Sequence, residues 1–511
     1  MCDLRPVLPP DLSALLADRA AVYGERSAVL TERINLTFAA LDRDADAWSA
    51  TLQAAGCGAG THVGLLAANS PEWLAAAFGV WRAAATLVPI STFVTVRELA
   101  EILAHADVEV LIVQPRLRSH DYLHMIEQMP RLPRLRKVIV LDTQAAADGA
   151  QGSMRSAIDP NAVACMLYTS GTTGTPKGVM LSHRAALATV LPTAHRSGLT
   201  AADTLLSTLP LFWVAGLLIR ALPTLAAGCT LILMETFTAD ALVAALDRHR
   251  PTALHLRPPQ VGQVLAHPRF RPELLAQVRK GGGRAEWYAP HLTGARFITG
   301  YGMTETAGYV TALDWHDPAT AAQTPLGTPL PGMELRIVDD TGRPCGAGDV
   351  GAVCVRGPGL FSGYYKRPAG SGLDDAGFFM TGDLGNLDAA GTFHFVGRSK
   401  DLLRVKGINV SPVEVEGVLA AHPGVEAAYV VGIPPDGLEQ QVVALIVAKP
   451  GASPAAVTLQ AHAALALSHY KRPQKYLFIE RHDVALSATS KPQRSMLVEL
   501  ATRHIAKQRR G

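Results

Sequence analysis

The stretch that decides the fold runs from residue 168 to residue 179 and has the sequence Tyr-Thr-Ser-Gly-Thr-Thr-Gly-Thr-Pro-Lys-Gly-Val. An apolar run at residues 162–167 precedes it and predicts a buried strand. The glycines let the backbone turn tightly, the hydroxyl groups can donate hydrogen bonds, and Lys177 adds a mobile positive charge. Such a set of donors suits a polyphosphate. An ordinary Ser/Thr/Gly surface loop is the alternative, and the preceding strand and the closing lysine argue against it. The candidate phosphate-binding residues are Thr169, Ser170, Gly171, Thr172, Thr173, Gly174, Thr175 and Lys177.

Further motifs follow along the chain and carry groups that suit a nucleotide. Residues 300–306, Gly-Tyr-Gly-Met-Thr-Glu-Thr, offer a ring that can stack on a base, a hydroxyl for a phosphate and Glu305 as an oxygen ligand for Mg²⁺. Residues 380–384 place Asp383 in a turn, where its carboxylate can accept hydrogen bonds from a ribose diol. An aspartate that only fixes its own turn is the alternative. Three later stretches, residues 397–401, 405–412 and 487–494, add Arg398 and Lys400, then Lys406 and Gly407, and last Lys491.

Composition limits the class of protein. A chain of 511 residues is too long for one ordinary core, and 48% hydrophobic with 18% charged residues is typical of a globular protein. The net charge of +3 gives no support to nucleic-acid binding. Six scattered cysteines, without a Cys-x-x-Cys pair, favour a reducing, cytoplasmic location. No apolar stretch predicts a transmembrane segment, and the N-terminus does not resemble a signal peptide.

The order of apolar runs predicts the architecture. Helices expected at residues 11–23 and 96–105 alternate with strands expected at residues 63–67, 86–90 and 108–113, which favours parallel α/β layers. A second α/β run extends over residues 200–310. Glycine-rich β-type runs at residues 325–398 predict a small antiparallel subdomain, and strands and helices alternate again from residue 401.

Together the motifs resemble those of the acyl-adenylate-forming superfamily of AMP-dependent synthetases and ligases. They span residues 168–494 and resemble most the acyl-CoA ligase branch. The resemblance implies an α/β fold with a large N-terminal domain, residues 1–399, built from two α/β subdomains and a small distorted β-barrel. A small, mobile C-terminal α+β domain, residues 400–511, is expected to follow a hinge at Lys400.

The resemblance also implies roles for single residues. The loop at residues 168–179 would hold the β- and γ-phosphates of ATP, and Lys491 would bridge the substrate carboxylate and the α-phosphate. The implied catalytic residues are Lys491, Thr304 and Glu305, with Mg²⁺ on Glu305. The implied ATP- or AMP-binding residues, besides the loop, are Gly282, Gly283, Tyr301, Gly302, Met303, Asp383 and Arg398. The implied coenzyme A-binding residues are Lys406 and Gly407.

The expected reaction has two steps. A carboxylate is a poor acylating agent because hydroxide leaves badly, and coupling to AMP supplies a better leaving group. The carboxylate would first attack the α-phosphorus of ATP, and the thiol of coenzyme A would then attack the acyl-adenylate. By resemblance, the C-terminal domain rotates about Lys400 between the steps, so that Lys491 leaves the site and Gly407 enters.

The acyl pocket is expected near residues 209–217, which resemble the start of the acyl-pocket helix. Glycines at positions 216, 302 and 308 are expected to leave volume, so a bulky apolar acid is predicted: medium or long aliphatic, aryl or polycyclic. Trp213 packing only in the core is the open alternative. The pocket candidates are Phe212, Trp213, Val214, Gly216, Leu217, Arg284 and Gly308.

Four residues depart from the family pattern: Trp213, Arg284, Ser490 and Pro492. They flank the adenylation geometry, whereas the residues of the thioester step are intact. The alternative function is therefore that of an adenylation-impaired enzyme. A companion adenylating ligase would supply it with acyl-AMP, and it would transfer the acyl group to coenzyme A. Whether the chain forms a homodimer is left open. An oxidising relative that uses no thiol and a regulatory module without turnover have no positive support in the sequence.

Overall fold

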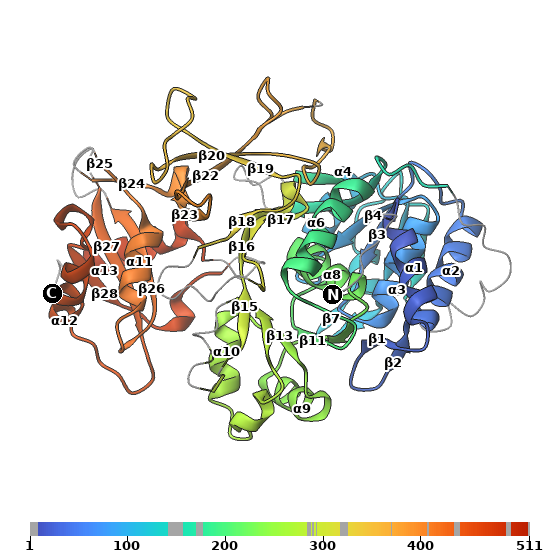
Figure 1. Ribbon diagram of the computed structural model, residues 1–511, viewed down its shortest axis with the longest axis horizontal. Helices are drawn as coiled ribbons and strands as arrows, with labels where there is room; N and C mark the ends of the chain where they lie inside the picture. Colours follow the sequence, from blue (N-terminus) through green and yellow to red (C-terminus); the bar gives the residue numbers. More distant parts are fainter. Residues whose placement is uncertain are drawn as a thin grey trace. The chain divides into compact units, whose positions relative to one another are not determined.

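The structure is a computed structural model that describes residues 9–141, 157–169, 177–283, 288, 291–292, 294–316, 325–368, 370–405, 408–433, 440–486 and 492–508. The chain forms two compact units, whose elements are labelled in Figure 1. Unit 1 comprises Met1–Leu335 and Val355–Phe379, and unit 2 comprises Arg336–Cys354 and Met380–Gly511. The predicted hinge, Lys400, lies within unit 2 and stays a prediction. Within the described ranges, no helix is both long and apolar enough to cross a bilayer.

The first sheet of unit 1 has seven strands in the order β15-β14-β13-β11-β12-β1-β2. All of its pairs are parallel except the edge pair of β1 and β2. Ser207, His255, Gly282 and Ile298 end adjacent strands in register, so they meet at one edge, where parallel sheets bind ligands. The strands are β1 (Ser27–Leu30), β2 (Asn35–Thr37), β11 (Thr204–Ser207), β12 (Thr230–Leu233), β13 (Ala253–His255), β14 (Lys280–Gly282) and β15 (Arg296–Ile298).

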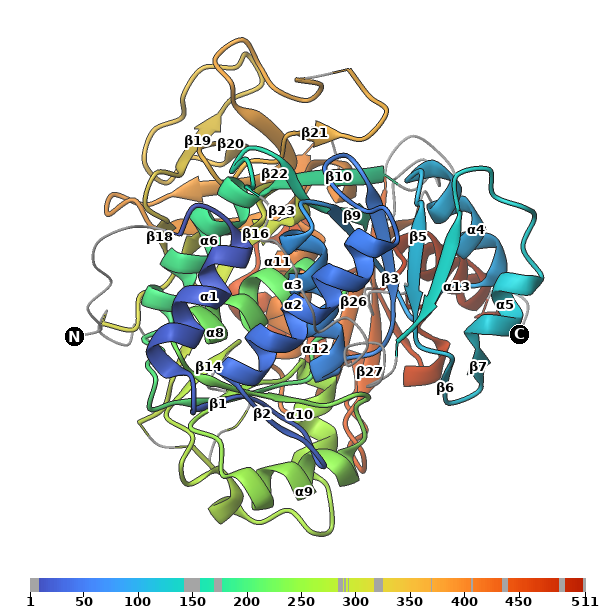
Figure 2. The ribbon, with the colours of Figure 1, turned by 90° about the vertical axis from the view of Figure 1, so that its right-hand side faces the viewer.

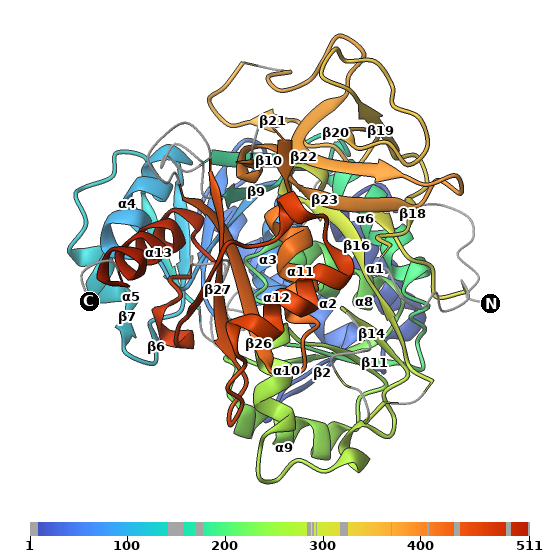
Figure 3. The same ribbon diagram turned by 90° about the vertical axis from the view of Figure 1, so that its left-hand side faces the viewer.

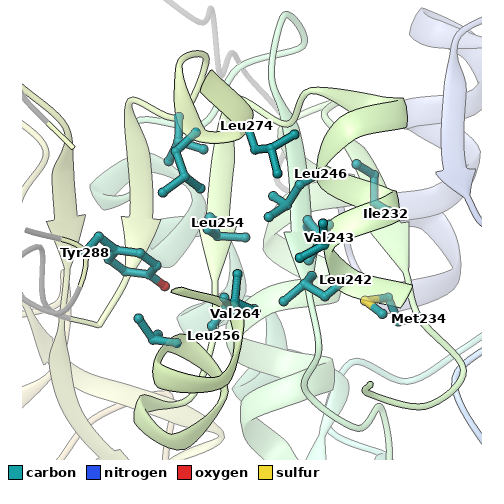
Figure 4. Close-up of a cluster of buried hydrophobic side chains, with 14 of the residues drawn as sticks. Ile232, Met234, Leu242, Val243, Leu246, Leu254, Leu256, Val264, Leu274 and Tyr288 are labelled. Atoms are coloured by element: carbon teal, nitrogen blue, oxygen red, sulfur yellow. The ribbon is translucent and has the colours of Figure 1, made fainter. Parts of the chain in front are cut away.

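One face of this sheet carries an apolar cluster under α9 (Ala239–His249) and α10 (Pro258–Leu265). Figure 4 shows Leu242 and Leu246 of α9 directed at Leu254 and at the strands beside it. These side chains are fully buried. This packing fixes the strands whose carboxyl ends carry His255 and Gly282.

The second sheet of unit 1 also has seven strands, in the order β21-β10-β9-β4-β3-β5-β8. Strands β3, β4, β5, β8 and β9 are parallel, whereas β10 and β21 run antiparallel to their neighbours. The predicted buried strand before the signature stretch is therefore confirmed as β9. The strands are β3 (His62–Leu66), β4 (Thr86–Ile90), β5 (Val110–Val113), β8 (Lys137–Val140), β9 (Val163–Thr169), β10 (Lys177–Ser182) and β21 (Gly363–Tyr364). A small hairpin is formed by β6 (Arg116–Leu117) and β7 (His120–Asp121).

Local signals in the sequence explain the helices that surround these sheets. Ser70 accepts a hydrogen bond from the backbone N–H of Trp73 and caps α3, and Thr95 forms a capping box with Glu98 at the start of α4. Helices α1, α2 and α3 pack against one another (Figure 2). The helices are α1 (Leu12–Tyr23), α2 (Phe38–Ala54), α3 (Pro71–Arg82), α4 (Val96–His105), α5 (Tyr122–Glu127), α6 (His183–Arg196), α7 (Val214–Gly216) and α8 (Leu222–Ala226).

Short antiparallel strands follow, as the glycine-rich sequence predicts. The expected closure into a small barrel stays a prediction, because the described strands form separate sheets. Unit 1 has the sheet of β16 (Gly300–Met303), β17 (Gly308–Ala312) and β18 (Thr328–Pro329). The other sheet has the order β19-β20-β22-β23, with β19 (Glu334–Val338), β20 (Gly351–Arg356), β22 (Phe379–Leu387) and β23 (Phe393–Arg398).

The C-terminal part of unit 2 is an α+β layer structure, as expected. One face of its three-stranded sheet packs on α11 and α12, and the opposite face packs on α13 (Figure 3). Alternation along the strands explains this, since Val430 points to α11 and α12 while Val431 points to α13. The elements are β24 (Leu403–Val405), β25 (Ile408–Val410), α11 (Pro412–Ala420), β26 (Val425–Ile433), β27 (Gln441–Ala448), α12 (Ala456–Ala466), β28 (Lys475–Phe478) and α13 (Arg494–Gln508).

Candidate active site

The two ends of the predicted phosphate loop lie side by side. Thr169 ends β9 and Lys177 begins β10, and the two residues are direct partners in the antiparallel ladder. Both are only partly buried. The structure therefore delivers Lys177 to the end of the second sheet. The other loop candidates, Ser170, Gly171, Thr172, Thr173, Gly174 and Thr175, lie outside the described residues.

Tyr364 connects Lys177 with Glu305. The Nζ atom of Lys177 lies 5.2 Å from the centroid of the Tyr364 ring, and the Tyr364 hydroxyl donates to Oε1 of Glu305 over 2.9 Å. Burial, followed by the nearby Glu305 carboxylate, raises the pKa of Tyr364 well above its usual value, so the hydroxyl keeps its proton. Strand β21 pairs with β10 and so brings Tyr364 to this place. Sequence reasoning missed this tyrosine, although it stands in a Gly-Tyr-Tyr run with the turn residues of an edge strand.

The backbone around Glu305 forms a fixed turn. Glu305 lies in the 3₁₀ turn η4 (Thr304–Thr306), where the Thr306 hydroxyl accepts from the Met303 N–H and donates to the Gly308 carbonyl. The Phe361 N–H donates to the Glu305 carbonyl at 2.8 Å. Thr304 and Glu305 therefore stay partly exposed at a rigid corner.

Glu305 offers one carboxylate to a metal ion, and one of its oxygens has no bond to Tyr364. Within the described ranges, no group of three or more His, Cys, Asp or Glu side chains could hold a metal. Mg²⁺ needs no such group, because it is bound through one or two carboxylates with water and substrate phosphates. Glu305 fits Mg²⁺ on these terms.

The nucleotide candidates Gly282, Gly283 and Tyr301 lie close together along the sheet edge. Gly282 ends β14, and the N–H of Gly283, whose φ is 103°, donates to the carbonyl of Ile298 at 3.3 Å. Tyr301 follows in β16 and is buried. The structure therefore brings the two predicted motifs to one place.

The expectation that glycines leave volume for the substrate is wrong at two positions. A Cβ at Gly216 would overlap the carbonyl of Pro210, and a Cβ at Gly302 would overlap the carbonyl of Gly308. These glycines permit close packing of backbone on backbone. Gly308 itself has a φ of 128°, which excludes most side chains.

An aromatic cluster marks the predicted acyl pocket. The ring of Trp213 lies 5.6 Å from Phe212 and 6.4 Å from Phe93, and the Phe93 side chain is 56% exposed. The guanidinium of Arg257 lies 5.9 Å from the Trp213 ring. Trp213 is thus partly accessible at a surface. The candidate Val214 begins α7, Leu217 begins the π-helical turn η1 (Leu217–Ala221), and Arg284 lies outside the described residues.

Arg220, on η1, is a buried arginine that sequence reasoning missed. Its Nε donates to Nδ1 of His255 over 2.8 Å, and its Nη2 donates to the hydroxyl of Tyr309 over 3.1 Å. Arg220 is only 4% exposed, and a Cβ at Gly282 would overlap both its guanidinium and the His255 ring. The sequence could have indicated Arg220, because this arginine stands inside an otherwise apolar run.

Asp383 and Arg398, the predicted ribose contacts, are cross-strand partners in unit 2. They face each other in the ladder of β22 and β23, and Nε of Arg398 lies 3.4 Å from Oδ1 of Asp383. The Asp383 side chain is 6% exposed and the Arg398 side chain is 49% exposed. The structure thus places this pair together, as a shared ribose contact requires.

Lys400 lies in the 3₁₀ turn η5 (Ser399–Asp401), directly after β23. Arg494 at the start of α13 binds Glu416 at 3.0 Å and lies 3.8 Å from Asp401 in the same turn. The turn is therefore tied to the C-terminal helix. Lys406, Gly407 and Lys491 lie outside the described residues.

Comparison with known proteins gives matches over nearly the whole chain. The family described as AMP-binding enzyme matches residues 16–365, and the family described as AMP-binding enzyme C-terminal domain matches residues 414–491. A sulfoacetate–CoA ligase of Cupriavidus necator is 31% identical over 92% of this chain and 94% of its own length. A feruloyl-CoA synthase of an Amycolatopsis species is 32% identical over 91% and 94%. The crystal structure of an anthranilate CoA ligase with anthranoyl-AMP superposes with a TM-score of 0.87 and 26% identity, over 98% of this chain and 99% of that chain.

Proposed function

Because the chain belongs to the family of AMP-binding enzymes, we propose that it joins a bulky apolar carboxylic acid to coenzyme A at the expense of ATP. The chain is an acid–thiol ligase that works through an acyl-adenylate and forms AMP. The main support for the proposal is that Tyr364 contacts both Lys177 and Glu305. It holds an ammonium group and a carboxylate together at the end of the predicted phosphate loop.

The reaction follows from charge and leaving groups. In the first step a carboxylate oxygen attacks the α-phosphorus of ATP, the bond to the β-phosphate oxygen breaks, and pyrophosphate leaves. In the second step the thiol sulfur of coenzyme A attacks the acyl carbon, AMP leaves, and the thiol proton passes to solvent. Negative charge moves along the phosphate oxygens in the first step, so fixed cationic groups and positioning supply most of the catalysis.

The residues of unit 1 divide the first step among them. Lys177 offsets negative charge on the departing pyrophosphate, and the loop hydroxyls donate hydrogen bonds to it. Tyr364 holds the Glu305 carboxylate in place by its hydrogen bond. Mg²⁺, when bound at Glu305, supplies charge stabilisation at the phosphate oxygens. Thr304 offers its hydroxyl to the α-phosphate, and Tyr301 and Gly283 border the adenine.

The residues of unit 2 serve the ribose and the change between steps. Asp383 accepts from the ribose hydroxyls, and Arg398 fixes Asp383 from the neighbouring strand. Lys491 brings the acid and the α-phosphate together for adenylation. Rotation at Lys400 then replaces Lys491 by the face that bears Lys406 and Gly407, on which the thiol arrives.

The aromatic cluster supports a bulky substrate. Phe93 and Trp213 present accessible ring surface and pack on the buried ring of Phe212, and flat rings offer a large area to an apolar body. The described residues give no support to the adenylation-impaired alternative: Tyr364 contacts both Lys177 and Glu305, to which we assign roles in the first step. The cytoplasmic location, a companion ligase and a homodimer stay predictions.

The test is a panel of carboxylic acids incubated with ATP, Mg²⁺ and coenzyme A, with pyrophosphate, AMP and acyl-thioester measured separately. We expect AMP and thioester in equal amounts with at least one aryl or long aliphatic acid. Thioester formed only from preformed acyl-AMP would contradict adenylation by this chain. Preference for short polar acids throughout would contradict the apolar pocket.

A further inference from the structure

Arg220 is a buried cation whose described partners are all neutral. Its Nε donates to His255, its Nη1 to the carbonyl of Ile219 at 3.1 Å, and its Nη2 to Tyr309. The guanidinium also lies 5.8 Å from the Tyr309 ring. No acidic side chain among the described residues pairs with it.

His255, which accepts from Arg220, is itself uncharged and so does not balance the positive charge of Arg220. Burial, followed by the adjacent Arg220 charge, lowers the pKa of His255 well below its usual value, so the imidazole is neutral. Neutral His255 accepts at Nδ1 and carries its proton on Nε2, which has no hydrogen-bond partner within the described ranges. Part of the His255 surface remains accessible.

Unused donors surround the charge. Each terminal nitrogen of Arg220 carries a second N–H that donates to none of these acceptors. With the His255 Nε2–H, these N–H groups form a positively charged group of donors for which the described part of the chain supplies no acceptor. Because the described residues supply no counter-ion for this buried guanidinium, and an unpaired buried charge is destabilising, the site favours an anion from outside the protein.

The location points to the acyl end of the substrate. His255 and Gly282 end adjacent parallel strands, at the edge where such sheets bind ligands. Arg220 stands on a π-helical turn that begins at Leu217, directly after the segment with Phe212 and Trp213. Such turns re-aim side chains and are frequent at functional sites. Gly282, which is a predicted nucleotide contact, lies against the guanidinium of Arg220.

We propose that the preferred substrate carries a second carboxylate at the far end of its acyl group, and that Arg220 and His255 bind this carboxylate. The inference rests on the proposed ligase function and specifies its substrate class, an apolar body between two carboxylates. Arginine matches a carboxylate because two N–H groups can meet two oxygens. The first carboxylate reacts with ATP, and the second stays ionised against Arg220.

The test compares acids in pairs that differ only at the far end, with a carboxylate in one member and a methyl group in the other. Pairs are made for alkyl chains of several lengths and for aryl propanoates, and kcat/KM for AMP formation is measured with the wild-type protein. We expect the diacid of at least one pair to be preferred by about 30-fold or more, as a charge-assisted hydrogen bond allows. Preference for the methyl member in every pair would overturn the inference and leave the ligase function standing.

Variants locate the effect. In Arg220→Met the ratio between the two members of the preferred pair should fall to about one, and Arg220→Lys should restore part of it through its point charge. Arg196→Met is the matched control, because Arg196 binds the backbone carbonyls of Ala312 and Pro329 and lies in the same unit. The control should keep the ratio. An unchanged ratio in Arg220→Met would refute the proposal, and absence of AMP with every acid would instead refute the proposed function.

If Arg220→Met does not fold, as judged by thermal melting, Tyr309→Phe provides the second test. It removes one neutral acceptor of Arg220 and keeps the charge, so a preference for the diacid should remain. Loss of the preference in this variant, with melting unchanged, would contradict recognition by the Arg220 charge.

Discussion

At the residue scale, one tyrosine controls where the predicted magnesium ligand points. The Tyr364 hydroxyl holds one oxygen of Glu305, while its ring lies near the ammonium group of Lys177. A carboxylate on a short turn otherwise has several side-chain rotamers, and only some of them meet a phosphate-bound metal ion. Tyr364 therefore acts through Glu305 and is a positioning residue.

Replacing Tyr364 by phenylalanine should lower kcat/KM for pyrophosphate release by about 10-fold, the size of one hydrogen bond to a charged group. The loss should shrink as the Mg²⁺ concentration rises, because excess metal compensates for a poorly placed ligand. Tyr365→Phe is the matched control, since the neighbouring hydroxyl binds Asp107 away from the site. Equal losses in both variants, or a loss that Mg²⁺ does not reduce, would contradict this role.

A buried histidine should make stability depend on pH. His183 accepts a hydrogen bond at Nδ1 from the N–H of Leu12, the first residue of α1, and burial lowers its pKa to about 4. Below the unfolded value of about 6.5, the unfolded chain takes up a proton that the folded chain refuses, so stability falls as the pH drops from about 6.5 towards 4.

The size of this effect at pH 5 is about 2 kcal/mol, from about 1.4 kcal/mol for each pH unit. Urea unfolding at pH 7 and pH 5 should show that wild-type protein loses about this much more stability than His183→Gln, whose amide accepts without titrating. Identical losses in the two proteins would mean that His183 is not the group responsible.

At the scale of elements, glycines decide how closely loops and helices pack. Gly216 on α7 lies against the carbonyl of Pro210, whereas Gly262 on α10 has no atom within 4 Å of the position that a Cβ would take. The same substitution should therefore have opposite effects at the two positions.

Gly216→Ala should destabilise the protein by about 1–3 kcal/mol through overpacking, and Gly262→Ala should stabilise it by about 0.5–1 kcal/mol through helix propensity. Denaturant unfolding of both variants beside the wild type measures the difference. Stabilisation by alanine at position 216 would show that the loop before α7 moves freely.

The sequence predicted elements where local signals agree, and it missed features that depend on tertiary contacts. Apolar runs and caps predict β9 and α4 because neighbouring residues alone determine them. The pairing of β21 with β10, which delivers Tyr364, joins residues far apart in the chain and leaves no local signal. The presence of a glycine at position 302 likewise does not reveal whether its neighbour is backbone or open space, so the expected volume for the substrate was wrong there.

Among the site residues, the motifs predicted Asp383 and Arg398 as nucleotide contacts, and the structure adds that the two face each other on adjacent antiparallel strands. The motifs did not predict Arg220, since one arginine in an apolar run has no motif. Its meaning comes from the neutral groups that tertiary folding places around it.

At the scale of the whole molecule, the two half-reactions should separate by mutation. Lys491→Ala should lower the rate of AMP formation from acid and ATP by about 100-fold or more. The variant lacks the ammonium group that bridges the substrate carboxylate and the α-phosphate. The same variant should keep most of its rate with synthetic acyl-AMP and coenzyme A, since Lys491 leaves the site before that step.

Lys400→Pro is the complementary variant: it should spare adenylation and slow thioester formation, because a fixed backbone φ restricts the hinge. Equal losses in both half-reactions for both variants would contradict the exchange of faces.

The central claim is that one acyl-adenylate binds to the nucleotide residues that the motifs predict. A crystal structure with a non-hydrolysable acyl-sulfamoyl adenosine tests it most directly. The account predicts the base beside Tyr301 and Gly283, the ribose on Asp383, and the sulfamoyl group near Thr304. A ligand bound elsewhere, with Tyr301 and Asp383 untouched, would contradict it.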